Sequence, residues 1–397
     1  MDRVLPAQLR KQHIRENSYG TVKIYPGRVQ PVHIKKKKKK NPLLAFVRFL
    51  FCCAFLSVFC YVIAPVLYTD YFEPLILNHI LNRKIHADMS RYVSVHLDYL
   101  HNSWLFGRNL LVPAQKSSKE LVSIVKSGEL TTTKSMLEDL FKKYPNMHPS
   151  VYVWEYSSAK EVNINADESF SAASIIKLPV LFELFRKIDR SGKLGTNETS
   201  LSKKLLYNDI NRTSGSGQLQ YMPLNRKLSV DYLAKIMITQ SDNSATNMLI
   251  EEAGGMAAVN SSMRSLGLDE IKLQNRLPDL EGTNKITARQ IATLLYNLDN
   301  PRFLSQKSKI TIKEYMANVE NRRLLQAGLP PEAILIHKTG DIGKMLGDAG
   351  VVYAQNGRKY IVVILVKRPH NDYSARDMIQ EASRIIYKNI NSGIDVM

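Results

Sequence analysis

Cysteine is nearly absent from this chain of 397 residues. The three cysteines, Cys52, Cys53 and Cys60, all lie in one apolar segment near the N-terminus. The chain beyond Cys60 has no thiol, which excludes a disulfide framework, a thiol nucleophile and a thiolate-bound metal there. Histidines and carboxylates form no cluster with the spacing of metal ligands, so the sequence predicts no metal and no other cofactor.

Acidic residues are few relative to basic ones, and the formal net charge is +19. The excess is concentrated at one end, because residues 1–48 contain 13 Lys or Arg against Asp2 and Glu16, a balance of +11. The rest of the chain carries 42 basic and 34 acidic side chains, a balance of +8. No basic stripe interleaved with aromatic residues occurs there, so nucleic acid is not expected as a partner.

Charge is missing altogether from Phe49–Leu67, a run of 19 residues. As a helix this run would span about 28 Å, close to the roughly 30 Å hydrocarbon core of a bilayer. A cleaved signal peptide is the alternative, but its apolar region should be only about 7–15 residues. The length favours an uncleaved signal anchor over residues 43–68, a single transmembrane helix. Lys35–Lys40 would then stay in the cytoplasm, with the C-terminal bulk in the periplasm or outside the cell.

Three further segments follow from composition and periodicity. Residues 1–42 mix proline, glycine and charge without periodicity, and are expected to form a disordered cytoplasmic tail. Residues 69–128 form a juxtamembrane segment whose role the sequence does not define. Residues 129–397 have the alternating and helical patterns of a folded domain, with no internal repeat.

Strand patterns lie near both ends of this domain, with helical patterns between them. A capping box at Ser135–Glu138 predicts the start of a helix, and Thr287–Gln290 predicts another. Strands are expected around 151–153 and 162–164 and at 334–337, 350–353 and 360–367, and helices at 175–188, 230–253, 291–298 and 374–389. The pattern predicts an α/β (α+β) fold, with an antiparallel sheet from both domain ends, flanking helices and a helical subdomain.

Three short motifs follow one another inside this domain: Ser174-Ile175-Ile176-Lys177, Ser241-Asp242-Asn243 and Lys338-Thr339-Gly340. The second and third each occur once. Ser-x-x-Lys also starts at Ser123, Ser157 and Ser200, but only the Ser174 copy opens an apolar helical run and precedes the other two motifs. Exposed helical turns are the expected setting of the other copies.

The Ser174 motif has the composition of an activated nucleophile. Residues three apart on a helix share a face, so Ser174 and Lys177 are expected to be neighbours. A serine hydroxyl needs a base to take its proton, and a lysine is that base only when burial or a second cation lowers its pKa. Neighbouring isoleucines provide apolar surroundings, and Lys338 provides a candidate second cation.

The ordered motifs resemble those of the class A β-lactamase and penicillin-binding-protein superfamily, over residues 131–397. The resemblance implies that Ser174 is acylated, that Lys177 is its base and that Ser241 relays a proton to the leaving nitrogen. It also implies that Asn243 binds the substrate's side-chain carbonyl, and that Lys338 and Thr339 bind its carboxylate. Gly340 would let substrate lie against the strand, and the backbone N–H groups of Ser174 and Asp341 would form the oxyanion hole.

One departure from this family concerns the release of the acyl group. Class A β-lactamases carry a glutamate, on a loop between the second and third motifs, that activates water. Here the corresponding segment, residues 276–284, is shorter and has Pro278 near the glutamate's position. Asp279 and Glu281 are the candidate substitutes, but general-base geometry tolerates little displacement. The sequence therefore predicts intact acylation and slow deacylation.

Three functions remain open for a membrane-anchored domain of this kind. The first is a serine hydrolase that opens β-lactams, with slow release of the acyl group. The second is a penicillin-binding peptidase that acts on the D-Ala-D-Ala end of peptidoglycan stem peptides. The third is a receptor or structural domain that binds a β-lactam or wall peptide without turnover. Intact Ser174, Lys177, Ser241 and Lys338 argue against a purely structural domain.

Overall fold

The structure is a computed structural model that describes residues 48, 51–56, 59, 123–196 and 198–395. The expected tail 1–42, most of the expected anchor 43–68 and most of the segment 69–128 lie outside these residues. Residues 51–56 are helical. Within the described part of the chain, no helix combines the length and apolar character needed to cross a membrane.

A six-stranded sheet forms the centre of the domain, in the order β1-β3-β2-β10-β9-β8. Its N-terminal half and C-terminal half join where β2 pairs antiparallel with β10, and only β1 and β3 are parallel. This confirms the predicted sheet built from both domain ends. The strands are β1 (Gly128–Glu129), β2 (His148–Glu155), β3 (Lys160–Ile164), β8 (Ile334–Ile342), β9 (Met345–Tyr353) and β10 (Lys359–Lys367).

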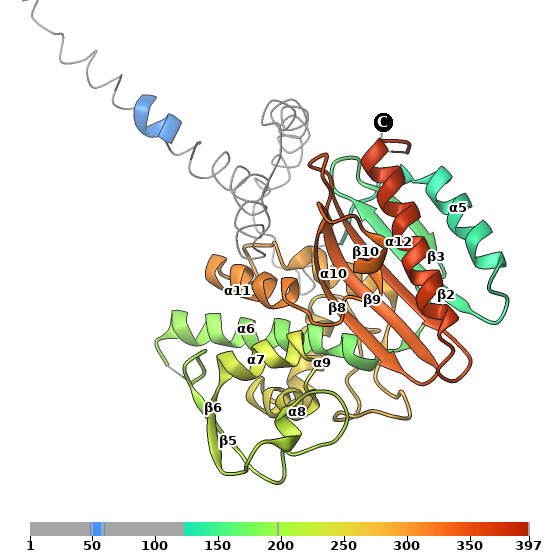
Figure 1. The fold of residues 1–397 in the computed structure, drawn as a ribbon. Coiled ribbons are helices and arrows are strands. Elements are labelled where there is room, and N and C mark those ends of the chain that lie inside the picture. The colour runs from blue at the N-terminus through green and yellow to red at the C-terminus, as the bar shows by residue number, and fades with distance from the viewer. Residues whose placement is uncertain (1–47, 49–50, 57–58, 60–122, 197, 396–397) are drawn as a thin grey trace, which may run out of the picture. The chain divides into compact units, whose positions relative to one another are not determined.

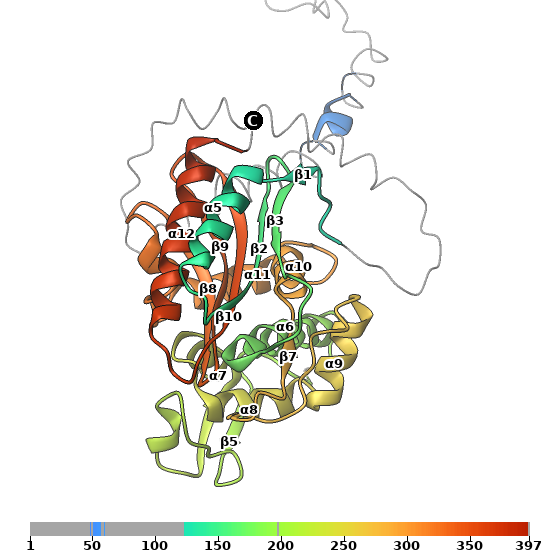
Figure 2. The same cartoon turned by 90° about the vertical axis from the view of Figure 1, so that its right-hand side faces the viewer.

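Helices cover both faces of this sheet, as Figures 1 and 2 show. On β10, Ile361, Val363 and Leu365 face one core, while the alternating residues Val362 and Ile364 face another. Burial on both faces explains why this strand is almost continuously apolar. One core lies beneath α5 (Thr131–Lys142) and α12 (Ser374–Ser392), with the short turn η7 (Leu325–Gly328). The other core contacts the helical subdomain.

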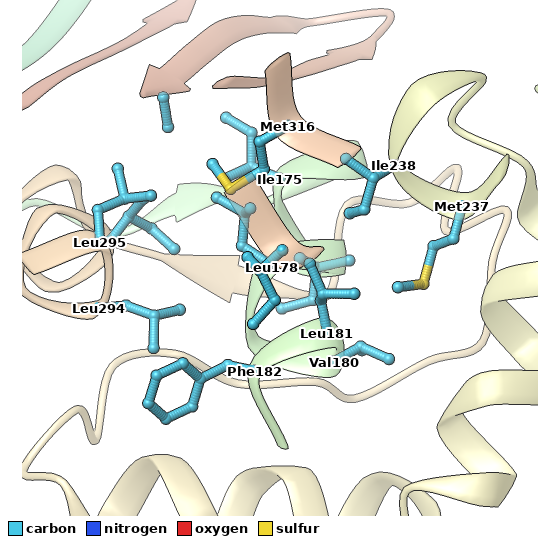
Figure 3. Packing of buried hydrophobic residues seen from close by; sticks show 14 of the residues in the cluster. Ile175, Leu178, Val180, Leu181, Phe182, Met237, Ile238, Leu294, Leu295 and Met316 are labelled. Atoms are coloured by element: carbon cyan, nitrogen blue, oxygen red, sulfur yellow. The ribbon is translucent and has the colours of Figure 1, made fainter. Parts of the chain in front are cut away.

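The helical subdomain is organised around α6 (Lys177–Leu194), which is buried on all sides along its first half. Figure 3 shows apolar residues of this region, such as Leu181, packed among side chains such as Met237 and Leu294 from other helices. The other elements are η5 (Ala173–Ile176), η6 (Leu219–Tyr221), α7 (Val230–Thr239), α8 (Asn243–Glu252), α9 (Gly255–Ser265), α10 (Ala288–Asn297) and α11 (Gln306–Ala317), with the paired strands β4 (Phe170–Ser171) and β7 (Lys285–Ile286), and β5 (Lys204–Tyr207) and β6 (Arg226–Ser229).

The prediction of one helix over 230–253 was wrong, because the chain breaks between α7 and α8. Ser241 adopts a left-handed backbone conformation with φ 59°. Asp242 then caps α8, its carboxylate accepting the N–H of Ala245 at 2.8 Å. A side chain that satisfies an open N–H group in the first turn starts a new helix.

The capping box predicted at Ser135–Glu138 was also wrong, since α5 already begins at Thr131. Its first turn is capped from the far end of the chain. The Asp395 carboxylate accepts the N–H groups of Thr132 and Thr133 at 3.1 and 2.7 Å. The helix start predicted at Thr287 is confirmed, because its hydroxyl accepts the N–H of Gln290 at the start of α10. The reciprocal half of the box does not form, because Gln290 Oε1 accepts the N–H of Glu270 instead.

Candidate active site

Ser174 lies in η5, immediately before α6. Ala173 adopts a left-handed conformation with φ 42°, which is uncommon for a residue with a side chain. Ile175 and Ile176 are fully buried and anchor the turn in the core, whereas Ser174 is only half-buried. The turn therefore presents the serine hydroxyl at the start of the central helix.

Lys177, the first residue of α6, connects two of the three motifs. Its Nζ lies 2.9 Å from Ser174 Oγ and 3.0 Å from Ser241 Oγ. The same nitrogen lies 2.8 Å from the Ser241 carbonyl oxygen and 3.0 Å from Asn243 Oδ1. The side chain is completely buried, so one amine brings four of the site's polar atoms together.

Burial lowers the pKa of Lys177 well below its ordinary value, and the positive charge of Lys338 lowers it further. The carboxylate of Asp242 acts in the opposite direction on this pKa. Both causes of the lowering disfavour an ammonium in this position. They are the two causes that the sequence suggested.

The four contacts of Lys177 suit a neutral amine. The Ser241 carbonyl and the Asn243 Oδ1 atom can only accept hydrogen bonds. A neutral amine has two N–H groups for these two oxygens and one lone pair left over. That lone pair can accept a proton from a hydroxyl, either that of Ser174 or that of Ser241. The arrangement can therefore deprotonate a serine.

The Ser241-Asp242-Asn243 motif owes its geometry to the break between α7 and α8. The left-handed conformation of Ser241 turns both its carbonyl and its hydroxyl toward Lys177. Asn243 is held on its other side, because its Nδ2 donates to the Ser214 carbonyl at 3.1 Å and its backbone N–H to that of Ser216 at 3.0 Å. The loop containing Ser214 and Ser216, between β5 and β6, is a part of the site that the sequence motifs do not reveal.

The Lys338-Thr339-Gly340 motif lies on β8, the edge strand next to η5. A Cβ atom on Gly340 would be 3.0 Å from Ile175 Cγ1 and 3.3 Å from the Ala172 carbonyl oxygen. Glycine thus permits the close approach of the edge strand to the serine turn. Asp341 is the next residue of this strand. The exposed carboxylate of Asp341 forms an ion pair with Arg368.

Lys338 is completely buried, and its Nζ donates to the Thr339 carbonyl at 2.8 Å. Burial lowers the pKa of Lys338 to about 8, against an opposing effect of the Asp348 carboxylate. Lys338 is therefore mostly an ammonium at neutral pH. The site combines a lysine suited to be neutral with a lysine suited to be charged, which matches the separate roles of a base and an anion-binding group.

The candidate deacylation carboxylates lie in the loop after α9, and their contacts are local. Asp279 accepts the N–H and hydroxyl of Thr283 at 3.0 and 2.8 Å and the N–H of Asn284 at 2.7 Å. Glu281 is exposed. Within the described residues, neither carboxylate hydrogen-bonds to Ser174 or Lys177. Asp279 closes its own loop rather than reaching the serine.

The loop itself is fastened to the site by a residue that the sequence analysis missed. Asn247 on α8 donates to the Leu277 carbonyl at 2.7 Å and accepts the Leu277 N–H at 2.9 Å. Asn247 lies one helical turn after Asn243, so it shares a face with a site residue. That spacing, four residues after a motif residue, was the available signal.

The other Ser-x-x-Lys copies lie outside the site, and the prediction that they form exposed helical turns was wrong, because none of them is helical. Ser157 donates from its hydroxyl to Glu155 in the turn after β2, and Ser200 Oγ lies 3.2 Å from Ser202 Oγ on the surface. The lysine of the latter copy, Lys203, pairs with Glu252. Ser123 lies at the first described residues before β1. The structure brings together only the Ser174 copy with the second and third motifs.

Comparison with known proteins gives a consistent result. Residues 132–390 match the sequence model of the β-lactamase enzyme family. A β-lactamase of Streptomyces albus G is 28% identical over 256 residues, which are 60% of this chain and 79% of that protein. An extended-spectrum β-lactamase of Pseudomonas aeruginosa is 25% identical over 230 residues, which are 55% of this chain and 74% of that protein.

Solved structures agree with this assignment. The structure of PBP-A has a TM-score of 0.64 and 33% sequence identity, over 68% of this chain and 100% of PBP-A. A leucine-to-glutamate variant of PBP-A, solved as an acyl-enzyme complex with penicillin G, gives the same score and identity. Because the family match covers more than half of the chain, this protein belongs to the β-lactamase enzyme family of serine hydrolases.

Proposed function

We propose that this protein opens β-lactams through an acyl intermediate on Ser174. The observation that carries the proposal is the buried amine of Lys177, within 3.0 Å of the Ser174 and Ser241 hydroxyls and of the Asn243 amide oxygen. A lysine held neutral beside two hydroxyls has the chemistry of a general base. The β-lactamases to which the chain is similar support β-lactams as the substrate class.

The proposed acylation transfers one proton and exchanges one bond. As Ser174 Oγ attacks the carbonyl carbon of the lactam, its proton moves to Lys177 Nζ. The N–H groups of Ser174 and Asp341 stabilise the negative oxygen that forms. The C–N bond then breaks, and the Ser241 hydroxyl donates its proton to the leaving nitrogen. Lys177 passes the proton that it took from Ser174 to Ser241, which restores the hydroxyl. Asn243 binds the substrate's side-chain carbonyl during these steps.

We expect the acyl intermediate to be long-lived, because neither candidate carboxylate hydrogen-bonds to Ser174 or Lys177, and Asp279 is held by its own loop. A positioned base contributes about 10²–10⁴ to such a rate. A chromogenic cephalosporin should therefore give a burst close to one equivalent of enzyme, followed by slow turnover. Stopped-flow absorbance at several enzyme concentrations measures both phases.

The two candidate carboxylates provide the controls for this experiment. Glu281→Ala should leave the burst and the slow phase unchanged, because this exposed side chain has no role in the proposal. An alanine variant at Asp279 or Glu281 that acylates normally and accumulates more acyl-enzyme would identify a working base. Fast steady-state turnover without a burst would contradict slow deacylation.

A second candidate function is a peptidase for the D-Ala-D-Ala end of peptidoglycan stem peptides. The similarity to PBP-A, a variant of which was solved as an acyl-enzyme with penicillin G, supports a domain that binds penicillin. The local hydrogen bonds of Asp279, none of which reaches Ser174, favour slow turnover of such a ligand. Incubation with a synthetic stem peptide, followed by mass spectrometry, distinguishes the candidates. Loss of one alanine at a rate above that of β-lactam turnover would favour the peptidase, and binding of either ligand without turnover would favour a receptor.

Lys338 is expected to bind the carboxylate of the ligand together with Thr339. Lys338→Ala should lower acylation efficiency by roughly 10- to 150-fold, since a charge-assisted hydrogen bond contributes about 1.5–3 kcal/mol. The loss should shrink for an esterified ligand without the negative charge. Lys344→Ala, which removes an exposed lysine from the same hairpin, is the control. Equal losses with both ligands would exclude this role of Lys338.

We also propose that residues 43–68 anchor the chain in the cell membrane, with the catalytic domain in the periplasm or outside the cell. The uncharged run Phe49–Leu67 and the preceding lysines support this orientation. Protease added to spheroplasts should digest the chain beyond about residue 69. A protected C-terminal domain, or a mature protein that begins near Ala64, would contradict the anchor.

A further inference from the structure

A buried contact between a histidine and an aspartate lies behind the edge strand that carries Lys338. His337 Nδ1 is 2.9 Å from Asp348 Oδ1 and 3.0 Å from Oδ2. The histidine is 2% exposed and the aspartate 0%. Burying a carboxylate away from water costs free energy unless hydrogen-bond partners compensate for the lost hydration. The burial of Asp348 therefore calls for a structural or functional reason. The mechanism proposed above uses neither residue.

The sheet is built to hold this pair. Gly350 lies opposite His337 in the register of β8 and β9, and a Cβ there would be 2.7 Å from His337 Cβ. Asp348 also accepts the N–H of Leu325 in η7 at 3.2 Å. The Leu325 carbonyl in turn accepts the Ser383 hydroxyl of α12 at 2.8 Å. The pair thus fastens the edge strand to the layer behind the sheet.

The two residues flank the anion-binding motif from the opposite face. His337 directly precedes Lys338, and Asp348 lies opposite Thr339 in the register. Because side chains alternate along a strand, His337 points away from the face on which Lys338 lies. The contact from His337 to Asp348 therefore joins β8 to β9 on the face of the sheet opposite to the Lys338 side chain.

We propose that His337 and Asp348 are positioning residues that hold the Lys338–Thr339 segment of the edge strand ready to bind a ligand carboxylate. The inference rests on the proposed function, since it assigns the pair a part in binding the anionic group of the substrate. Without the pair, the edge strand keeps its backbone hydrogen bonds to β9 and the packing of Leu335 against the core beneath α12, but loses its polar connection through Asp348 to η7. The backbone of Lys338 is then held less firmly, and its ammonium loses the nearby negative charge of Asp348.

The charge of Asp348 gives the pair a second effect, on the titration of Lys338. The charged groups near the motif are Lys177 and its neighbour Asp242 on the helical side, Asp341 with Arg368 directly after the motif, and Asp348 behind the strand. The elements η7 and α12 contribute an amide and a hydroxyl. Asp348 raises the pKa of Lys338 against the lowering caused by burial. Carboxylate binding requires the ammonium, so it is lost as pH rises through this pKa. Removing the Asp348 charge should lower the pKa of Lys338, so carboxylate binding should be lost at a lower pH.

The test compares acylation by a fluorescent penicillin and by its methyl ester between pH 6 and 10. For Asp348→Asn, the alkaline limb with the penicillin should move down by about one pH unit. His337→Leu should slow acylation by the penicillin about tenfold and by the ester much less. His337→Asn should restore the rate, because its amide provides an N–H donor toward Asp348. Glu155→Gln, at a buried carboxylate on β2, is the control.

Superimposable pH profiles for all variants, with equal effects on both ligands and a lower melting temperature, would overturn the proposal and leave a purely structural pair. If Asp348→Asn does not fold, the two His337 variants decide by the difference between the ligands. If the wild-type protein is not acylated at all, the proposed function fails separately. The pair is then tested by NMR titration of labelled Lys338, whose pKa should fall in Asp348→Asn and is unchanged if the proposal is wrong.

Discussion

Ser174→Ala should abolish covalent labelling by a fluorescent penicillin, while the domain stays folded. The substitution removes the attacking oxygen and one hydrogen bond to Lys177, which costs only about 1 kcal/mol of folding stability. Gel fluorescence measures the labelling, and the melting temperature reports folding. Ser157→Ala and Ser200→Ala remove the serines of two other Ser-x-x-Lys copies and should label as wild type. Labelling that survives Ser174→Ala would exclude this serine as the nucleophile.

Lys177→Ala should slow acylation by about 10²–10⁴, because proton abstraction from Ser174 then depends on water. Unlike the loss at Lys338, this loss should be the same for ligands with and without a carboxylate. Lys203→Ala, in the Ser200 copy of the motif, is the matched control. Single-turnover rates from stopped-flow fluorescence provide the measurement. A loss restricted to carboxylate-bearing ligands would reassign Lys177 to substrate binding.

The two lysines also predict a bell-shaped dependence of acylation efficiency on pH. Lys177 must be neutral, so acylation rises as pH increases through its lowered pKa. Lys338 must be charged, so acylation falls as pH increases through about 8. The alkaline limb should disappear with an esterified ligand. An acidic limb that persists in Lys177→Ala would contradict the assignment of the base.

The sequence allowed the sheet and the first contact of the site to be predicted, because both follow from local patterns. The run Ile361–Val366 of β10 is almost continuously β-branched, and its burial on both faces matches that composition. Ser174 and Lys177 meet because three residues bring side chains to one face of a helical turn. The motifs' order along the chain was enough to select this copy.

Other features depended on contacts that no local pattern records. The cap of α5 comes from Asp395, more than 250 residues later, so the nearer Ser135 box was misleading. The break between α7 and α8 depends on the backbone conformation of Ser241, a residue with no intrinsic preference for it. Ser214 and Asp348 reach the motifs only through loop placement and strand register.

The most direct test of the account is to locate the penicillin adduct on the wild-type protein. After brief incubation with penicillin G, digestion and tandem mass spectrometry should find one adduct per chain, on the peptide that contains Ser174. The mass should equal that of the intact penicillin added to the peptide, since ring opening by acylation loses no atoms. An adduct on the peptide of Ser123, Ser157 or Ser200, or no adduct while the antibiotic is consumed, would contradict an acyl-enzyme on Ser174.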